Sequence, residues 1–127
     1  MNNVERWLPV MDWEHIYEVS NFGHIRNSRT KKIKAQQINN RGYRICQFES
    51  KGIKETVLVH RVVARAFVIM IYGKLVVNHK DNNKLNNRAE NLEWTTQKEN
   101  VNHAIVNGFA DPKKAGAKGL KTRWQKI

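Results

Sequence analysis

The sequence is short of cysteine, of acidic residues and of long apolar runs. Cys46 is the only cysteine among 127 residues, which excludes a disulfide framework and any zinc site built from four thiolates. No apolar stretch approaches the ~20 residues that a membrane-spanning helix needs, and no signal-peptide pattern opens the chain. We therefore expect a soluble cytoplasmic protein with no membrane partner, and Cys46 itself is expected in a strand.

The scarcity of acidic residues leaves a strongly basic chain, with 23 Lys and Arg against 11 Asp and Glu and a net charge of +12. The excess lies in two blocks: residues 26–54 hold nine basic residues and one acidic residue, and residues 111–127 hold six and one. Such blocks are typical of proteins that bind nucleic-acid phosphates. A surface that is basic only for solubility would mix the two signs, and it is the weaker alternative.

The first half of the chain predicts a small antiparallel sheet followed by a helix. Residues 17–20 alternate apolar and polar side chains before a turn at Asn21–Gly23, which indicates a hairpin. Further short strands and turns follow within residues 26–58. Residues 60–68 then show the apolar periodicity of a helix. Its first residue, His60, is expected to be a satisfied structural histidine, with phosphate contact as the alternative.

Alternation along the predicted sheet is expected to place basic side chains away from the core, where they could contact DNA. A solvated face with no partner is the alternative. Residues 111–127 are basic and interrupted by glycine, so they are interpreted as an arm lying along phosphates, or else as a terminus without contacts. The candidate DNA-binding residues are Arg26, Arg29, Lys31, Lys32, Lys34, Arg41, Arg44, Lys113, Lys114 and Lys118.

The second half predicts a strand, a polar loop, a second strand and a helix. Val76 and Val77 lead into His79, and a loop rich in Asn and Asp separates them from residues 92–95. Thr96–Glu99 has the form of a capping box, after which apolar residues recur at helical spacing as far as Gly108. This order places His79 at a strand end and Asn100 in the first helical turns, close enough to share one small site.

The spacing of His79, Asn91 and Asn100 resembles the signature of HNH nucleases, in the branch found in phage and intron-borne homing endonucleases. Three upstream segments resemble the nuclease-associated DNA-binding module that precedes the HNH unit there: residues 7–9, 17–26 and 59–67. The resemblance covers residues 5–108. It implies an α+β fold with an antiparallel β DNA-binding lobe (1–58), a helix plus a ββα-metal HNH nuclease unit (59–110) and a basic C-terminal arm (111–127).

The resemblance also implies a site-specific endonuclease that hydrolyses phosphodiesters of double-stranded DNA. With one active unit per chain, a monomer that nicks one strand is the simplest outcome, and a double-strand cut would need a dimer or two successive events. His79 would be the general base, and Asn91 would brace the loop and orient the imidazole. Asn78 and Asn100 would hold one divalent metal through side-chain oxygens. Mg²⁺ is the expected ion, Mn²⁺ is the alternative, and no small-molecule cofactor is expected. If the gene belongs to a phage, the protein would act in the cytoplasm of the bacterial host.

One position departs from the better-described relatives, which have Asp immediately before the catalytic histidine where this chain has Asn78. A neutral amide holds Mg²⁺ less tightly than a carboxylate does. Asp81 is interpreted as a loop brace, with metal ligation as the alternative. His103 is a possible third ligand, or it packs or bonds to phosphate. A DNA-binding protein with an inactive HNH unit, and a structural or RNA-binding protein, are the competing functions.

Overall fold

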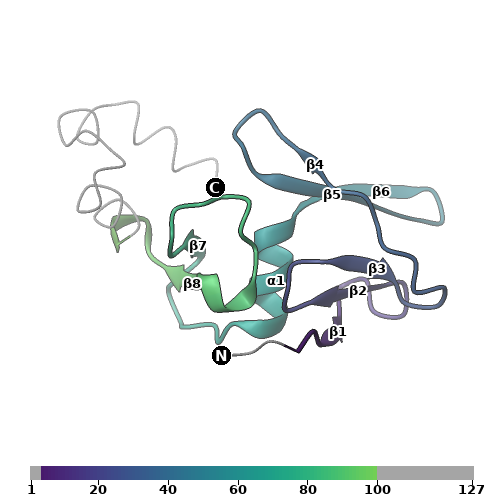
Figure 1. Cartoon of the computed structure of the whole chain (residues 1–127), viewed down its shortest axis with the longest axis horizontal. Helices are drawn as coiled ribbons and strands as arrows, with labels where there is room; N and C mark the ends of the chain where they lie inside the picture. The colour runs from purple at the N-terminus through teal and green to yellow at the C-terminus, as the bar shows by residue number, and fades with distance from the viewer. Residues whose placement is uncertain (1–3, 100–127) are drawn as a thin grey trace.

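The computed structural model describes residues 4–99, which form three small antiparallel sheets around one helix (Figure 1). The first sheet joins β1 (Trp7–Pro9), β2 (Tyr17–Ser20) and β3 (Ile25–Asn27). The second joins β4 (Gln37–Ile38), β5 (Arg44–Ser50) and β6 (Ile53–Leu58), and the third pairs β7 (Val76–His79) with β8 (Leu92–Thr95). Helix α1 (Val59–Phe67) follows β6, and the 3₁₀ turn η1 (Ala89–Asn91) precedes β8. The expected α+β fold is confirmed.

The β2–β3 hairpin forms where the alternating pattern predicts it. Val19 and Ile25 are fully buried on the inner face. The Ser20 hydroxyl accepts hydrogen bonds from the backbone N–H groups of Phe22 and His24, both at 3.1 Å. Gly23 completes the turn with a φ of +93°, in the left-handed region that favours glycine.

The basic region differs from its prediction in two ways. It belongs to two separate sheets instead of one, and the alternation over residues 33–36 is shifted by one residue. Ile33 and Ala35 are exposed, whereas Lys34 and Gln36 are half-buried. Tertiary contacts cause the shift: the Lys34 ammonium lies 5.3 Å from the centroid of the Tyr17 ring, and Gln36 donates a hydrogen bond to the Gly23 carbonyl at 2.9 Å.

Arg44 is a second correction to the predicted basic face. Side chains alternate along β5, so Arg44 shares its face with Cys46 and Phe48, which are fully buried. Arg44 is therefore half-buried on the core side of the strand, instead of lying on the outer face. Its position at the first residue of β5 places it at the margin of the core.

Helix α1 is the element around which the three sheets pack, and Figure 1 shows it between the β7–β8 hairpin and the two N-terminal sheets. Its apolar stripe includes Val59 and Val63, both fully buried. One core cluster joins this stripe to all three sheets through residues such as Ile25, Phe48 and Leu92. Within residues 4–99 no helix is long and apolar enough to cross a membrane.

Candidate active site

The β7–β8 hairpin presents two faces with different chemistry. Its register pairs Asn78 with Glu93 and His79 with Leu92. Because side chains alternate across a strand, His79 and Leu92 face α1 while Asn78 and Glu93 lie on the opposite face. His79 and Asn78 are only 6% and 5% exposed. The short hairpin thus holds both predicted site residues in buried positions, at the point where β7 ends.

The His79 ring is oriented by Asn87, from the loop between the two strands. Its Nε2 lies 2.7 Å from Asn87 Oδ1. With the amide in this orientation, Nε2 carries the ring proton and donates it to the oxygen, so Nδ1 keeps a lone pair. Burial is the largest influence on the His79 pKa and lowers it, as does Lys84, against the opposing effects of Asn87 and Asp81. A neutral imidazole with a basic Nδ1 is therefore favoured near pH 7.

Two aromatic side chains from other elements pack around the His79 ring. The His60 ring of α1 lies 5.0 Å from it, and the Tyr43 ring lies 5.0 Å from His60 and 6.2 Å from His79, measured between centroids. Burial lowers the His60 pKa to about 3, with smaller effects from His79 and Arg61. Its Nδ1 is buried and has no hydrogen-bond partner in the described part of the chain. His60 is thus a neutral, structural neighbour of His79, but not the satisfied histidine that was expected.

The loop after His79 is held by Asp81 and Asn91. Asp81 Oδ1 accepts hydrogen bonds from Asn83 N at 2.8 Å and Asn91 Nδ2 at 2.9 Å, and its Oδ2 accepts one from Asn86 at 2.9 Å. Burial acts to raise the Asp81 pKa, but these hydrogen bonds prevail and lower it. Asp81 therefore braces the loop. Asn91 also forms two hydrogen bonds with the loop backbone: its Oδ1 accepts one from Asp81 N, and its Nδ2 donates one to the Asn86 carbonyl.

The residue that contacts the imidazole, Asn87, received no role from the sequence, since nothing local distinguishes it from the other Asn residues of the loop. The N-terminal turn holds it in place. Gly23 packs against Asn87 itself, since a Cβ at Gly23 would lie 3.1 Å from the Asn87 carbonyl oxygen. The residues after Asn87 are held by the same turn. Ala89 N donates a hydrogen bond to Asn21 O at 2.8 Å, and the Arg88 guanidinium lies 3.9 Å from the centroid of the Phe22 ring. The first sheet therefore shapes the site in the second half of the chain.

Two side chains on the outer face of the hairpin are suited to a hard cation. Asn78 Nδ2 donates a hydrogen bond to Glu93 Oε2 at 2.9 Å, and Asn78 Oδ1 accepts none from the described residues. Residues 4–99 contain no group of three or more His, Cys, Asp or Glu side chains that could hold a metal. The described residues therefore offer a cation the Asn78 amide oxygen beside the Glu93 carboxylate, which fits Mg²⁺ with its remaining positions filled by water and phosphate.

The helix that would carry the other predicted ligand begins at the expected place. Thr96 N donates to Glu99 Oε1 at 3.0 Å and Glu99 N donates to Thr96 Oγ1 at 3.1 Å, the reciprocal bonds of a capping box. Asn100 and His103 lie outside the described residues, as does the arm with Lys113, Lys114 and Lys118.

Two family models match the chain, the NUMOD4 motif over residues 5–49 and the HNH endonuclease over residues 57–102. The chain belongs to the HNH endonucleases with an N-terminal NUMOD4 motif. It is 46% identical over 106 residues to an uncharacterized HNH endonuclease, L245, of Acanthamoeba polyphaga mimivirus, covering 84% of this chain and 32% of that protein.

A phage relative and a solved structure show the same family. The chain is 38% identical over 109 residues to the DNA endonuclease I-HmuI of Bacillus phage SP01, covering 86% of this chain and 63% of I-HmuI. A structure described as DNA binding and cleavage by the HNH homing endonuclease I-HmuI matches with a TM-score of 0.78 at 37% identity, covering 87% of this chain and 63% of that one. The chain thus spans less than two thirds of the length of each of these relatives.

The candidate DNA-binding residues of the NUMOD4 segment fall into two groups. Arg26 and Lys31 lie 2.8 and 3.4 Å from Glu18 Oε1, and the Arg26 guanidinium also lies 3.8 Å from the centroid of the Trp7 ring. These contacts partly neutralise both charges. Four of the candidates are exposed in turns or loops: Arg29, Lys31, Lys32 and Arg41.

The turn with Arg41 lies beside the HNH loop. Lys84 Nζ donates a hydrogen bond to the Arg41 carbonyl at 2.9 Å and lies 4.7 Å from the centroid of the Tyr43 ring. Tyr43 in turn packs near His79. One exposed basic turn of the NUMOD4 segment is therefore attached directly to the loop that orients His79.

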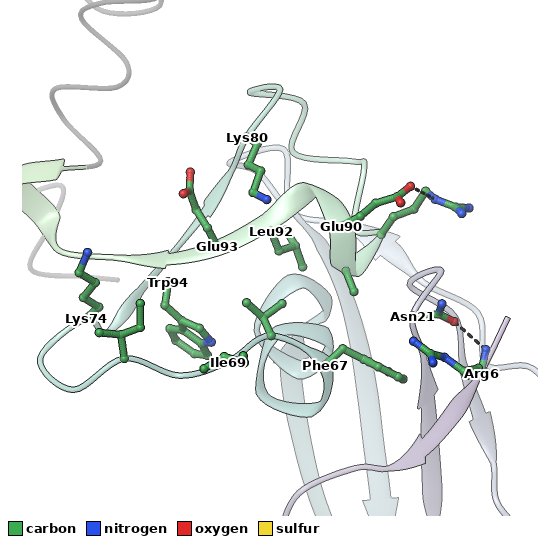
Figure 2. Close-up of a pocket in the computed structure, with 14 residues that line it drawn as sticks. Arg6, Asn21, Phe67, Ile69, Lys74, Lys80, Glu90, Leu92, Glu93 and Trp94 are labelled. Atoms are coloured by element: carbon green, nitrogen blue, oxygen red, sulfur yellow. Dashed lines mark hydrogen bonds and ion pairs between the residues drawn. The ribbon is translucent and has the colours of Figure 1, made fainter. Parts of the chain in front are cut away.

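A cavity of about 580 Å³ lies along β8 and beside the end of α1 (Figure 2), and Glu93 and Lys80 are among the residues that line it. Phe67, Leu92 and Trp94 line it, with Arg6 and Asn21 from the N-terminal segment. Neither His79 nor Asn78 lines this cavity. The candidate site is therefore taken as the hairpin and its loop, where the polar residues of the HNH unit converge.

Proposed function

We propose that this protein is a site-specific DNA endonuclease that nicks one strand of double-stranded DNA as a monomer, with His79 as general base. The observation that carries the proposal is the buried, neutral His79 ring, held through Nε2 by Asn87 at 2.7 Å beside Asn78. Membership of the HNH family supports a DNA substrate. The division into a DNA-binding lobe (1–58), a nuclease unit (59–110) and a basic arm (111–127) is part of the proposal.

The proton chemistry follows from the ring geometry. His79 Nδ1 takes a proton from the water that attacks the phosphorus, which makes the water a stronger nucleophile. The imidazolium that forms keeps its Nε2–H bonded to Asn87 Oδ1, so the ring holds its orientation while charged. Asp81, fixed in the loop by its three hydrogen bonds, adds a negative charge that favours the imidazolium. Hydrolysis leaves a 5′ phosphate and a 3′ hydroxyl.

HNH endonucleases generally use a divalent metal, and the oxygen donors of the outer hairpin face fit one. Asn78 Oδ1 and Asn100 are the proposed protein ligands, for Mg²⁺ or alternatively Mn²⁺. When bound, the ion neutralises phosphate charge and stabilises the departing 3′ oxygen. Asn91 acts indirectly, by fixing Asp81 and thereby the loop that carries Asn87.

DNA is proposed to lie across the exposed basic turns and to reach the site past the turn with Arg41. The 2.9 Å hydrogen bond from Lys84 to the Arg41 carbonyl connects that turn to the nuclease loop. Phosphate contacts at Arg29, Lys32 and Arg41 would set the register of the duplex relative to His79. Lys113, Lys114 and Lys118 are proposed to add phosphate contacts from the arm.

A plasmid-nicking assay tests the proposal. The unaltered protein should convert supercoiled plasmid to the nicked form when Mg²⁺ is added, and His79→Ala should not, while its DNA affinity stays nearly unchanged. Because burial lowers the His79 pKa, the nicking rate should rise with pH and reach half of its maximum below the ordinary histidine pKa of about 6.5. Normal turnover by His79→Ala would reject His79 as the base.

The second candidate function is a DNA-binding protein whose HNH unit is inactive. It is favoured by one observation, the neutral amide of Asn78 at a position where a carboxylate would hold the metal more strongly. This function predicts salt-dependent DNA binding without metal-dependent nicking. The same plasmid assay therefore separates the two.

A further inference from the structure

We propose that Glu93 supplies the negative charge that holds the divalent metal of the HNH unit, replacing the charge that a carboxylate at position 78 would provide. The inference rests on the proposed function, because it concerns the metal of that same site. It makes Glu93 a positioning residue that acts on the ion through Asn78.

The hairpin register brings the two side chains together. Asn78 and Glu93 are directly opposed on β7 and β8, and Asn78 Nδ2 donates to Glu93 Oε2 at 2.9 Å. Figure 2 shows Glu93 on the opposite side of β8 from Leu92 and Trp94, away from the core. Because Glu93 binds the nitrogen of the Asn78 amide, the amide oxygen is turned away from Glu93, and it accepts no hydrogen bond from the described residues.

Charge pairing singles out Glu93 among the acidic residues near the site. Asp81 is engaged by its loop hydrogen bonds. Glu90 pairs with Arg88 at 3.2 Å and Glu99 pairs with Lys74 at 2.9 Å. Within residues 4–99, Glu93 forms an ion pair with no other side chain. Its hydrogen bond goes to a neutral amide, so its negative charge is left to act on a cation bound at that amide.

The requirements of the cation support the same assignment. Mg²⁺ is usually held through one or two carboxylates, and both proposed ligands, Asn78 and Asn100, are neutral. A carboxylate that hydrogen-bonds to a ligand orients it and raises its affinity for the ion, and loss of such a partner typically lowers metal affinity about 10–100-fold. Glu93 meets both needs, since it fixes the amide and carries the missing charge.

The test measures Mn²⁺ binding to the full chain without DNA, from the electron paramagnetic resonance signal of free Mn²⁺. Glu93→Gln keeps an oxygen that accepts the Asn78 hydrogen bond but removes the charge, so affinity should fall about 10–100-fold. The double variant Asn78→Asp with Glu93→Gln moves the charge across the strand pair and should restore affinity. Glu90→Gln, a matched control on an acid already paired with Arg88, should bind Mn²⁺ like the unaltered protein.

Three results would overturn the proposal: unchanged Mn²⁺ affinity in Glu93→Gln, an equal loss in Glu90→Gln, or absence of Mn²⁺ binding by the unaltered protein. Thermal unfolding of every variant identifies any loss of affinity that comes from misfolding, and restoration by the double variant could not come from a misfolded chain. Failure of the proposed function has a different signature. It would appear as an unaltered protein that binds Mn²⁺ through Glu93 but does not nick plasmid.

Discussion

The buried histidine of α1 should make the stability of this protein fall as the solution becomes acidic. His60 is 4% exposed, and burial lowers its pKa to about 3, against about 6.5 in an unfolded chain. Between these values the unfolded chain binds a proton that the folded protein does not. The free energy of unfolding is therefore unaffected by protonation of His60 above pH 6.5, and it decreases progressively as the pH falls from 6.5 toward 3.

The size of the effect follows from the two pKa values. A pH of 5 is 1.5 units below the pKa of about 6.5 that His60 has in the unfolded chain, so the unfolded histidine is protonated while the folded one is still neutral. At ~1.4 kcal/mol per pH unit, the free energy of unfolding falls by about 2 kcal/mol. A loss of this size is large against the ~5–15 kcal/mol that holds a typical domain folded. It should be measurable in urea.

The experiment compares urea unfolding of the unaltered protein and His60→Phe at pH 7.5 and pH 5. Phenylalanine keeps a ring between Tyr43 and His79 and removes the buried Nδ1 that has no partner in the described residues. The unaltered protein should lose about 2 kcal/mol more than the variant on going to pH 5. His79 titrates in both proteins, so its contribution largely cancels. Equal losses would refute a neutral, buried His60.

Three shorter predictions concern DNA binding and the site. Affinity for DNA should fall by about three decades between 50 and 200 mM salt if some six phosphates are contacted, and removal of residues 111–127 should flatten that slope without changing site preference. Asn87→Ala should lower kcat about 10–100-fold with KM unchanged, because the imidazolium loses its hydrogen-bond acceptor. Gly23→Ala and Gly52→Ala both place alanine at positive φ, +93° and +81°, but only Gly23 adjoins Asn87. Nicking assays should therefore show a lower kcat for Gly23→Ala alone, while unfolding shows a loss of about 1 kcal/mol for Gly52→Ala and a larger loss for Gly23→Ala.

Several elements were determined by short-range pattern alone. The β2–β3 hairpin, helix α1, the strand ending at His79 and the capping box at Thr96–Glu99 all form where the sequence predicts them. Each depends on contacts between residues a few positions apart, such as alternating burial, helical periodicity or a reciprocal cap. The basic composition and the HNH spacing likewise indicated the family that the comparisons confirm.

Other features depended on where distant elements meet. The alternation over residues 33–36 is shifted because Lys34 and Gln36 find partners in the first sheet. The Arg44 side chain faces the core, since β5 packs against the cluster of Phe48. A sequence pattern predicts periodicity along a strand, but packing decides which face is buried.

The site shows the same division. The sequence alone indicated His79 and placed Asp81 as a loop brace, because the Asx-type bonds of Asp81 are local. It could not rank Asn87 above the neighbouring Asn residues, place His60 against His79, or oppose Glu93 to Asn78. Those contacts follow from the Gly23 turn packing on Asn87, from α1 packing under the hairpin and from the register of β7 and β8. The sequence determined which side chains are available for the proposed chemistry, and the packing of three sheets on one helix decided which of them meet.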